Sequence, residues 1–453
     1  MKNTLLLVTL VLSLNLNSLR SNAQCMAVGN GASGQVICMY QDTVHGWLYT
    51  GGGYTMSGTD TLNNCGYWND TTFHAMGTTG LWGASDSVWC MTEFGGKLYI
   101  GGSFVKAGGI TCNGIAMWDG LAWHAVGSGF DATVHALATF NGSLYAAGDF
   151  THAGAASVMH LAKWNGANWN QVAGGINDGV DALCAWKNGL YISGDFTLAG
   201  SLTVNHICKW NDTTFSALGI GMGYSMMGML PMVHSMCVYN GCLYAGGMFD
   251  QAGGMSMINM AKWNGTAWAS IGNVGTSMSS DIVSTLCVYN NCLFAGGVFG
   301  ACGSTSSSNI GIWNGTTWTT LGSGMNGSIH VMTVYHNKIY IGGSFTTAAG
   351  TAVKNIASYS TLTGIESIEG IDKAFSLFPN PARNTITCAW EQGLSGVANI
   401  QVFNISGVLV CQKEVNPGNN ESIVDLTLLN PGMYFMILRK DGILFRKMFS
   451  VSK

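Results

Sequence analysis

The sequence carries very little charge. Charged residues make up only 9% of its 453 positions, and no arginine occurs between residues 24 and 365. That span holds eight lysines against thirteen aspartates and one glutamate, a net charge of −6. Arginine is the usual side chain for recognising phosphate and carboxylate groups. Nucleic acids and anionic lipid surfaces are therefore poor partners for this chain.

Several motifs of known chemistry are missing as well. The sequence has no GxSxG, HExxH or CxxC segment, so no signature of a serine hydrolase or of a zinc site is present. Spacing alone also gives no Ser/His/Asp triad. After the N-terminus no apolar run is long enough to span a bilayer. We predict no catalytic residues and no transmembrane segment in the mature chain, and the sequence indicates no particular cofactor.

Residues 1–23 have the three parts of a secretory signal peptide. These are Lys2, an apolar stretch from Leu5 to Leu16, and small residues ending at Ala23. We therefore expect the mature protein to begin at Gln24, outside the cytoplasm. Export permits disulfides, but most of the 14 cysteines stand in repeat positions that hold small or apolar residues in sister repeats. They are predicted to be buried thiols.

A seven-residue stretch, Leu98-Tyr-Ile-Gly-Gly-Ser-Phe104, occurs in seven versions along the chain. The copies begin at Leu48, Leu98, Leu144, Leu190, Leu243, Leu293 and Ile339. A second motif starts 20 residues after each of these positions, as in Trp164-Asn-Gly-Ala-Asn-Trp169. A period of 46 to 53 residues indicates stacked supersecondary units. Each repeat reads as four strands, predicted in the third repeat at 134–140, 144–150, 160–164 and 169–173.

The last repeat stops at Tyr359, before its fourth strand. Residues Cys25 to Gly31 match the fourth-strand pattern of Trp123 to Gly129. The N-terminal strand is therefore predicted to complete the last repeat, which would hide the edges of a circular array. The sequence predicts an all-β protein, with a seven-bladed β-propeller over residues 24–360 closed by its N-terminal strand.

The repeats resemble those of kelch-like propellers, with a glycine pair in the second strand, an aromatic residue in the third and a tryptophan in the fourth. The residue pattern of the repeats, as in Leu98–Phe104 followed by Ile115-Ala-Met-Trp118, is similar to that of fungal cortical polarity-marker proteins and bacterial surface proteins. The resemblance covers residues 24–360. The arginine and acidic pair often seen in kelch repeats are missing, so the partners of kelch proteins do not transfer to this chain.

A different pattern follows a linker at residues 361–374. It opens with Phe375-Ser-Leu-Phe-Pro-Asn-Pro381 and contains an Asn-Pro-Gly-Met-Tyr segment near residue 432. Residues 375–453 are similar to the type A C-terminal sorting domain of the type IX secretion system of Bacteroidota, a small immunoglobulin-like β-sandwich. The resemblance rests on motif residues Pro379, Asn380, Pro381, Gly407, Gly432 and Tyr434. It implies passage through the outer membrane by the type IX machinery, then release or surface attachment, with the domain cleaved off.

One column of residues near the start of the first strand is not explained by the repeat. It reads Gln35, Trp89, His135, Asp181, His234, Ser284 and His330. In adjacent repeats His135, Asp181 and His234 are predicted to converge on one cation or polar ligand, because imidazole and carboxylate bind zinc and copper. The alternative is that these are polar residues at strand starts whose hydrogen bonds are satisfied by loop backbone.

Two loops at the same end of the repeats offer further candidates. Trp82 stands between the first and second repeats, where it would either stack on a sugar ring or cover its repeat. The loop from Gly221 to Met232 contains Tyr224 and five methionines. It would form an adaptable apolar partner surface, a plug over the channel or, with His234, a Cu(I) site.

These features predict an exported module, extracellular or attached to the cell surface, that binds glycan or protein ligands and serves in adhesion. The alternative is a carbohydrate-active enzyme, a lyase or a hydrolase, with its site at the mouth of the channel. An enzyme needs a compact cluster of acid, base and orienting groups. A binding module needs only an exposed aromatic or apolar patch. The low charge favours binding.

Overall fold

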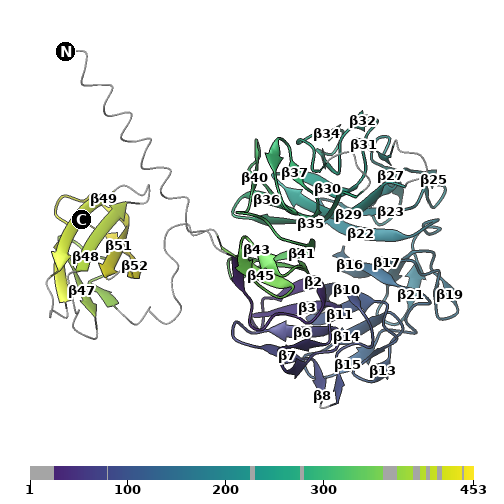
Figure 1. The fold of residues 1–453 in the computed structure, drawn as a ribbon, viewed down its shortest axis with the longest axis horizontal. Coiled ribbons are helices and arrows are strands. Elements are labelled where there is room, and N and C mark those ends of the chain that lie inside the picture. The colour runs from purple at the N-terminus through teal and green to yellow at the C-terminus, as the bar shows by residue number, and fades with distance from the viewer. Residues whose placement is uncertain are drawn as a thin grey trace. The chain divides into compact units, whose positions relative to one another are not determined.

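The computed structural model describes residues 25–78, 80–224, 230–275, 280–360, 375–390, 398–404, 409–415, 421–440 and 443–452. The chain divides into two compact units, residues 1–361 and 362–453. Within the described ranges all regular structure is β-strand and no helix occurs (Figure 1). The all-β class predicted from the sequence is confirmed.

Seven four-stranded antiparallel sheets make up the first unit. In chain order the sheets are β2 (Gln35–Asp42), β3 (Trp47–Gly53), β6 (Cys65–Trp68) and β7 (Phe73–Ala75); β10 (Val88–Phe94), β11 (Lys97–Gly102), β14 (Ile115–Trp118) and β15 (Trp123–Ala125); β16 (Val134–Phe140), β17 (Ser143–Gly148), β20 (Leu161–Trp164) and β21 (Trp169–Gln171); β22 (Val180–Trp186), β23 (Gly189–Gly194), β26 (Ile207–Trp210) and β27 (Phe215–Ala217); β29 (Met232–Tyr239), β30 (Cys242–Met248), β33 (Met260–Trp263) and β34 (Trp268–Ala269); β35 (Ile282–Tyr289), β36 (Cys292–Val298), β39 (Ile310–Trp313) and β40 (Trp318–Thr320); and β41 (Ser328–Tyr335), β42 (Lys338–Ser344), β45 (Ile356–Tyr359) and β1 (Cys25–Ala27). We call them the first to seventh sheets.

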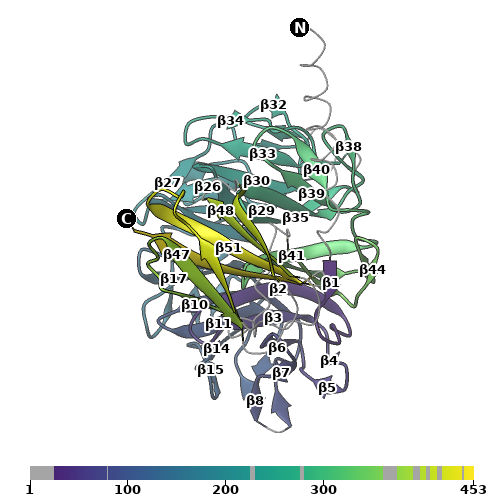
Figure 2. The same ribbon diagram turned by 90° about the vertical axis from the view of Figure 1, so that its left-hand side faces the viewer.

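The fourth strand of the seventh sheet comes from the other end of the repeats. Cys25 in β1 pairs with Tyr359 in β45, and Ala27 pairs with Ala357. Figure 2 shows β1 beside β44 (Thr351–Ala352), which it contacts. The predicted pairing between the N-terminal strand and the last repeat is present.

Consecutive sheets pack through their first strands and through a hydrophobic cluster of their own. β2, β10, β16, β22, β29, β35 and β41 each contact the next in this order, β41 contacts β2, and these strands gather near the centre of Figure 1. Seven separate clusters of buried residues lie between successive sheets, and one of them joins Val36 and Trp68 to Tyr340 of the seventh sheet. Each sheet by itself is open. The closed seven-bladed ring remains a prediction.

The tryptophans of the second repeat motif hold neighbouring sheets together. The two aromatic rings beside each turn lie close, as for Trp164 and Trp169, whose centroids are 5.0 Å apart. The indole Nε1 of Trp169 donates to the carbonyl of Val126 in the preceding repeat at 3.2 Å. The same bond, from an indole Nε1 to a backbone carbonyl of the preceding repeat, joins Trp123 to Met76, Trp268 to Leu218 and Trp318 to Ile271. These are structural residues, as the repeat pattern predicts.

An asparagine in a left-handed conformation also links consecutive sheets. Asn355 has a φ of 61°. Its Oδ1 accepts from the backbone N–H of Phe345 at 3.1 Å, and its Nδ2 donates to the carbonyl of Ala32 at 3.0 Å. Asn259 and Asn309 occupy the same position in the fifth and sixth sheets and reach the next sheet in the same way. The Asn355 bond crosses from the seventh sheet to the segment that precedes the first.

Short hairpins extend from the end of the sheets where the first strands begin. They are β4 (Met56–Ser57) with β5 (Asp60–Thr61), β8 (Gly77–Thr78) with β9 (Leu81–Trp82), β12 (Lys106–Ala107) with β13 (Ile110–Thr111), β18 (His152–Ala153) with β19 (Ala156–Ser157), β24 (Leu198–Ala199) with β25 (Leu202–Thr203), β28 (Met222–Gly223) with β31 (Gln251–Ala252) and β32 (Met255–Ser256), β37 (Ala301–Cys302) with β38 (Thr305–Ser306), and β43 (Thr347–Ala348) with β44. All 14 cysteines are free thiols.

The second unit contains two antiparallel sheets. One is β46 (Phe375–Phe378), β47 (Thr385–Trp390) and β50 (Glu421–Asp425), and the other is β49 (Leu409–Val415), β48 (Ala398–Asn404), β51 (Gly432–Lys440) and β52 (Ile443–Val451). Ile386, Val402, Met436 and Phe449 from the two sheets are fully buried in one core. Alternating burial along β50 fits a strand with one face on this core.

We expect Asn355→Gly to lower the free energy of unfolding by about 1–2 kcal/mol, because it leaves a backbone donor and a backbone acceptor without their partner. Glycine keeps the left-handed conformation, and Gly114 already occupies this position in the second sheet. Denaturant unfolding of the purified protein measures the change. Asn141→Gly is the control, since Asn141 is left-handed in an exposed turn. An equal effect of both changes would show that the two side-chain hydrogen bonds of Asn355 contribute nothing.

Candidate functional site

Each first strand contains a β-bulge near its start. In the third sheet Val134 pairs with Gly148 and Ala136 with Ala147, so His135 is an extra residue in the ladder. A bulge turns a side chain out of the regular alternation of the strand. The bulged residues of the seven sheets are Ile37, Trp89, His135, Asp181, His234, Ser284 and His330. The predicted column therefore coincides with the bulges, except that Gln35 is wrong: it pairs with Gly53, and Ile37 is the bulged residue.

The second glycine of the repeat motif makes the bulge possible. A Cβ atom on Gly148 would overlap the carbonyl oxygen of Thr133, and one on Gly194 would overlap that of Gly179. The matching glycine of each of the other sheets meets a backbone carbonyl in the same way. A side chain cannot occupy this position without moving the first strand. The glycine pair and the bulge are thus two parts of one local structure.

In two sheets the bulged side chain contacts the residue that follows this glycine. The imidazole Nε2 of His135 lies 2.9 Å from Oδ2 of Asp149, and Nε2 of His330 lies 3.2 Å from Oγ of Ser344. In the fourth sheet the corresponding residues are both acidic, Asp181 and Asp195. The third and fourth sheets therefore bring three carboxylates and one imidazole to the same end of neighbouring strands.

Neighbouring bulged residues also interact with one another. The rings of Trp89 and His135 meet edge to face, with centroids 5.6 Å apart. His135 interacts electrostatically with Asp181 and with His234. We call Trp89, His135, Asp149, Asp181, Asp195 and His234 the bulge cluster. Trp89 is 41% exposed, so an aromatic surface at the edge of this cluster is open to a ligand.

Burial and like charge shift the titration of the cluster. Burial first, and then the charges of Asp195 and Asp149, raise the pKa of Asp181 to about 7, although His135 opposes the shift. Burial and the nearby Asp178 also raise the pKa of Asp195. Oδ1 of Asp195 is buried without a hydrogen-bond partner in the described structure. Burial lowers the pKa of His234, and the charge of His135 adds to this.

The cluster can therefore donate and accept hydrogen bonds at neutral pH. A protonated Asp181 is a donor, whereas Asp149 accepts from His135. Hydroxyl and amine groups of a ligand match such a mixture. Among the residues that the structure describes, no three His, Cys, Asp or Glu side chains are close enough to hold a metal ion. The predicted set of His135, Asp181 and His234 does not form such a group.

Among the described residues, the other predicted site residues form no hydrogen bond, ion pair or ring contact with the bulge cluster. Trp82 is half-buried in the β8–β9 hairpin, and its carbonyl accepts from Asn63. His330 contacts Ser344 in the seventh sheet. Tyr224 is half-buried next to residues 225–229, which lie outside the described residues together with three of the loop's five methionines. Met222 is buried, and it pairs with Ala252.

Asp149 and Asp195 are the functional candidates that sequence reasoning missed. Both follow the glycine pair, where sister repeats carry serine, methionine or valine, so the repeat pattern alone reads as local variation at this position. The signal that identifies them is their occurrence in two consecutive repeats, opposite His135 and Asp181. Recognising it requires the register of the hairpin, which the bulge changes by one residue.

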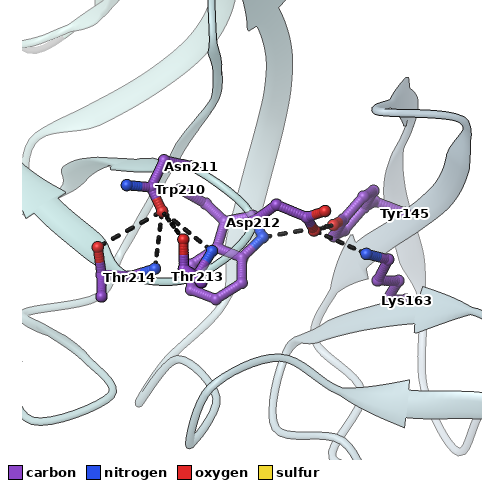
Figure 3. A network of polar contacts seen from close by, with 7 residues as sticks. All are labelled: Tyr145, Lys163, Trp210, Asn211, Asp212, Thr213 and Thr214. Atoms are coloured by element: carbon purple, nitrogen blue, oxygen red, sulfur yellow. Dashed lines mark hydrogen bonds and ion pairs between the residues drawn. The ribbon is translucent and has the colours of Figure 1, made fainter.

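A second polar group links the third and fourth sheets near their outer turns (Figure 3). Oδ1 of Asp212 accepts from the Tyr145 hydroxyl and from Nζ of Lys163, both at 2.6 Å, and the indole of Trp210 donates to the Tyr145 hydroxyl at 3.3 Å. The hydrogen bonds from Lys163 and Tyr145 lower the pKa of Asp212. This carboxylate is therefore ionised over the physiological range.

Asp212 occupies a position that favours glycine. Its φ is 76°, and four sister repeats have Gly120, Gly166, Gly265 or Gly315 there. A side chain in the left-handed region costs about 1 kcal/mol, and an ion pair as exposed as Lys163–Asp212, at about a third, contributes about 0–1 kcal/mol. The carboxylate therefore adds little net stability to the fold.

A pocket of about 320 Å³ adjoins this pair. It is lined by Ser143, Lys163, Trp164, Asn165, Asn170, Gln171, Val172, Ala173, Trp210 and Asp212. Ser143 follows the end of β16, whereas the bulge of β16 lies at its beginning. The pocket and the bulge cluster are thus at opposite ends of the strands. None of these lining residues stands out in the sequence as a candidate for ligand binding.

The predicted sorting motif has a structural role in the second unit. Oδ1 of Asn380, between Pro379 and Pro381, accepts from the backbone N–H of Ser450 at 3.0 Å, which fastens the first strand region to the last. The Tyr434 hydroxyl donates to the carbonyl of Asn430 at 2.8 Å. Gly432 begins β51. Gly407 lies outside the described residues.

Comparison with known proteins identifies this second unit. Residues 376–451 match the family model of the secretion system C-terminal sorting domain. The match supports export of the protein by type IX secretion, and it implies passage across the outer membrane to the cell surface or the medium. No curated protein matches the chain. In the described part of the structure, no helix has the length and apolar character needed to cross a membrane.

We expect the contribution of Asp181 to the free energy of unfolding to fall between pH 5 and pH 8. Its pKa is raised from 3.8 to about 7, so the folded state keeps a proton that the unfolded state has lost, and this advantage disappears as the pH rises through 7. Asp181→Asn should remove about 2–3 kcal/mol of pH-dependent stability between these two pH values, measured by denaturant unfolding at both.

Asp212→Asn is the matched control for this experiment. Asp212 is ionised at both pH values, so its replacement should change stability equally at pH 5 and pH 8. If Asp181→Asn and Asp212→Asn show the same pH dependence as the unmodified protein, the pKa of Asp181 is not raised.

Proposed function

We propose that the protein is an exported binding module, displayed on the cell surface or released, that holds a glycan or protein ligand at the bulge cluster. Residues 1–23 serve as the signal peptide, and the sorting domain engages the type IX machinery. The seven sheets form a closed, kelch-like seven-bladed β-propeller. The ring contacts of the first strands and the pairing of β1 with β45 support this arrangement.

The observation that carries this function is the placement of Trp89 against His135, beside three carboxylates. An aromatic face next to hydrogen-bonding groups suits a ligand that is apolar on one side and rich in hydroxyl or amine groups on another. Sugars have this character, and so do lysine-bearing protein surfaces. Rigid strands hold the side chains in place, which reduces the entropy lost on binding.

A second candidate function is a carbohydrate-active enzyme, a hydrolase or a lyase, at the same residues. The observation in its favour is the raised pKa of Asp181, at about 7, beside Asp195 and His135. General acids and bases work best when their pKa lies near the operating pH, and perturbed carboxylates cluster at catalytic sites.

Binding of the purified protein to a glycan array and to immobilised extracellular proteins tests the first proposal. We expect a bound ligand whose affinity falls at least about tenfold in His135→Ala and in Trp89→Ala, because each removes a group that faces the ligand. His330→Ala is the matched control, since it changes the same repeat position in the seventh sheet. A ligand that binds all three variants equally well would place binding elsewhere, and the absence of any ligand would reject the function.

Incubation of each bound glycan with the protein tests the second candidate. An enzyme should release product with a rate that depends on a group titrating near pH 7, and Asp181→Asn should lower that rate at least about a hundredfold while binding changes little. Product analysis by mass spectrometry gives the readout. If the glycans remain intact over days, the enzymatic function is rejected and the binding function is unaffected.

A further inference from the structure

The pocket between the third and fourth sheets has the size of a small-ligand site. Its volume of about 320 Å³ falls at the lower end of the range for such sites, roughly 300–1,000 Å³. One wall comes from the turn between β20 and β21, and the facing wall comes from Trp210 and Asp212 of the fourth sheet. The pocket therefore depends on two neighbouring sheets, which fix its walls.

The pocket contains several polar groups that the described structure leaves available. The side chains of Ser143 and Gln171 make no hydrogen bond with any residue that the structure describes. Asn165 uses only its Oδ1, which accepts from Ala167 and Asn168. Asn170 uses only its amide nitrogen, which donates to Asn168. Hydroxyl and amide groups such as these offer both donors and acceptors to a ligand.

The charges in the pocket cancel each other. Lys163 and Asp212 form an ion pair at 2.6 Å. The pocket therefore has no excess charge that would attract an anionic or a cationic ligand. Both bonds to Asp212 go to Oδ1, and the other carboxylate oxygen is open to a donor. A neutral molecule rich in hydroxyl groups fits this combination better than a charged one.

We propose that this pocket is a second binding site, and that it accepts one or two neutral sugar units. The Asp212 carboxylate accepts a hydrogen bond from one sugar hydroxyl. The side chains of Ser143, Asn165, Asn170 and Gln171 form hydrogen bonds with the remaining hydroxyls. This site rests on the proposed binding function and adds to it a second contact point, at the opposite end of the strands from the bulge cluster. A branched or extended glycan would engage each site with a different unit.

The pocket between the third and fourth sheets differs from the corresponding one between the first and second sheets. Between the first and second sheets the cavity near the strand ends measures only about 60 Å³. There the Tyr40 hydroxyl donates to Glu93 at 3.1 Å, and the His45 ring lies 2.7 Å from Asp42. Those polar groups are already paired with each other. The third and fourth sheets lack such a pairing across their pocket, apart from the bonds to Asp212.

Asp212→Gly tests the proposal, with Asp70→Gly as its matched control. Both aspartates are left-handed at the glycine position of the turn, and both reach the preceding sheet, Asp70 through His336 at 2.8 Å. Each change therefore removes one cross-sheet carboxylate and installs the residue of sister repeats. No pocket residue is altered in Asp70→Gly.

Isothermal titration of the full chain with glucose, galactose, mannose, fucose and N-acetylglucosamine, and with their disaccharides, is the measurement. We expect at least one of these sugars to bind, Asp212→Gly to weaken its binding at least tenfold, and Asp70→Gly to leave it unchanged. Gln171→Ala provides a second variant, because this exposed side chain makes no bond that the fold needs. Its affinity should fall about threefold to tenfold.

Two results would overturn the site. One is that none of these neutral sugars binds; the other is that a bound sugar is insensitive to both Asp212→Gly and Gln171→Ala. If that sugar is instead lost in His135→Ala, the ligand belongs to the bulge cluster, so the proposed function stands and the second site does not. If the protein binds no sugar and no protein ligand in any form, both proposals fail.

Discussion

The close approach of the second glycine of the repeat motif to a backbone carbonyl is the contact on which the architecture depends. In the third sheet Gly148 lies against the carbonyl of Thr133, and this contact forces the strand to accommodate an extra residue, His135. The same contact in every sheet repeats the same bend seven times. Because the extra residue lies outside the regular alternation of side chains along the strand, its side chain does not have to pack against a neighbouring sheet. The backbone geometry at the glycine is therefore the same in every repeat, whereas the side chain of the bulged residue can vary from repeat to repeat.

The sequence predicted the sheets well because their signals are local. The glycine pair, the Asn-Gly turns and the paired tryptophans fix the strands of each repeat without knowledge of other repeats. The column of candidate residues was less reliable in the first sheet, where residues 43–46 form a longer hairpin than the two-residue turns elsewhere. The bulged residue lies nine positions before the start of the glycine motif in the other six sheets but eleven positions before Leu48 in the first, so the spacing along the chain does not identify Ile37. Asp149 and the pocket at Asp212 depend on pairing register and on a neighbouring sheet, and neither can be read along one strand.

The third and fourth sheets differ from the other five in the residue that follows the glycine motif, which is aspartate only in these two. The bulged residues opposite are His135 and Asp181, so polar groups gather at one end of the strands. At the other end the Lys163–Asp212 ion pair joins the same two sheets. Local chemical variation on an otherwise uniform set of sheets is the pattern expected when function is added to a rigid scaffold.

The pairing of β1 with β45 joins residues more than three hundred positions apart. The edge of β45 stays unpaired until β1, which comes from the N-terminal end of the repeats, pairs with it. The seventh sheet is therefore completed only after long-range loop closure. An unpaired edge accepts any strand of the right sequence. The β1 segment of a second molecule carries that sequence too, which makes this single strand exchangeable between copies and gives concentrated, partly folded chains a route to swapped assemblies.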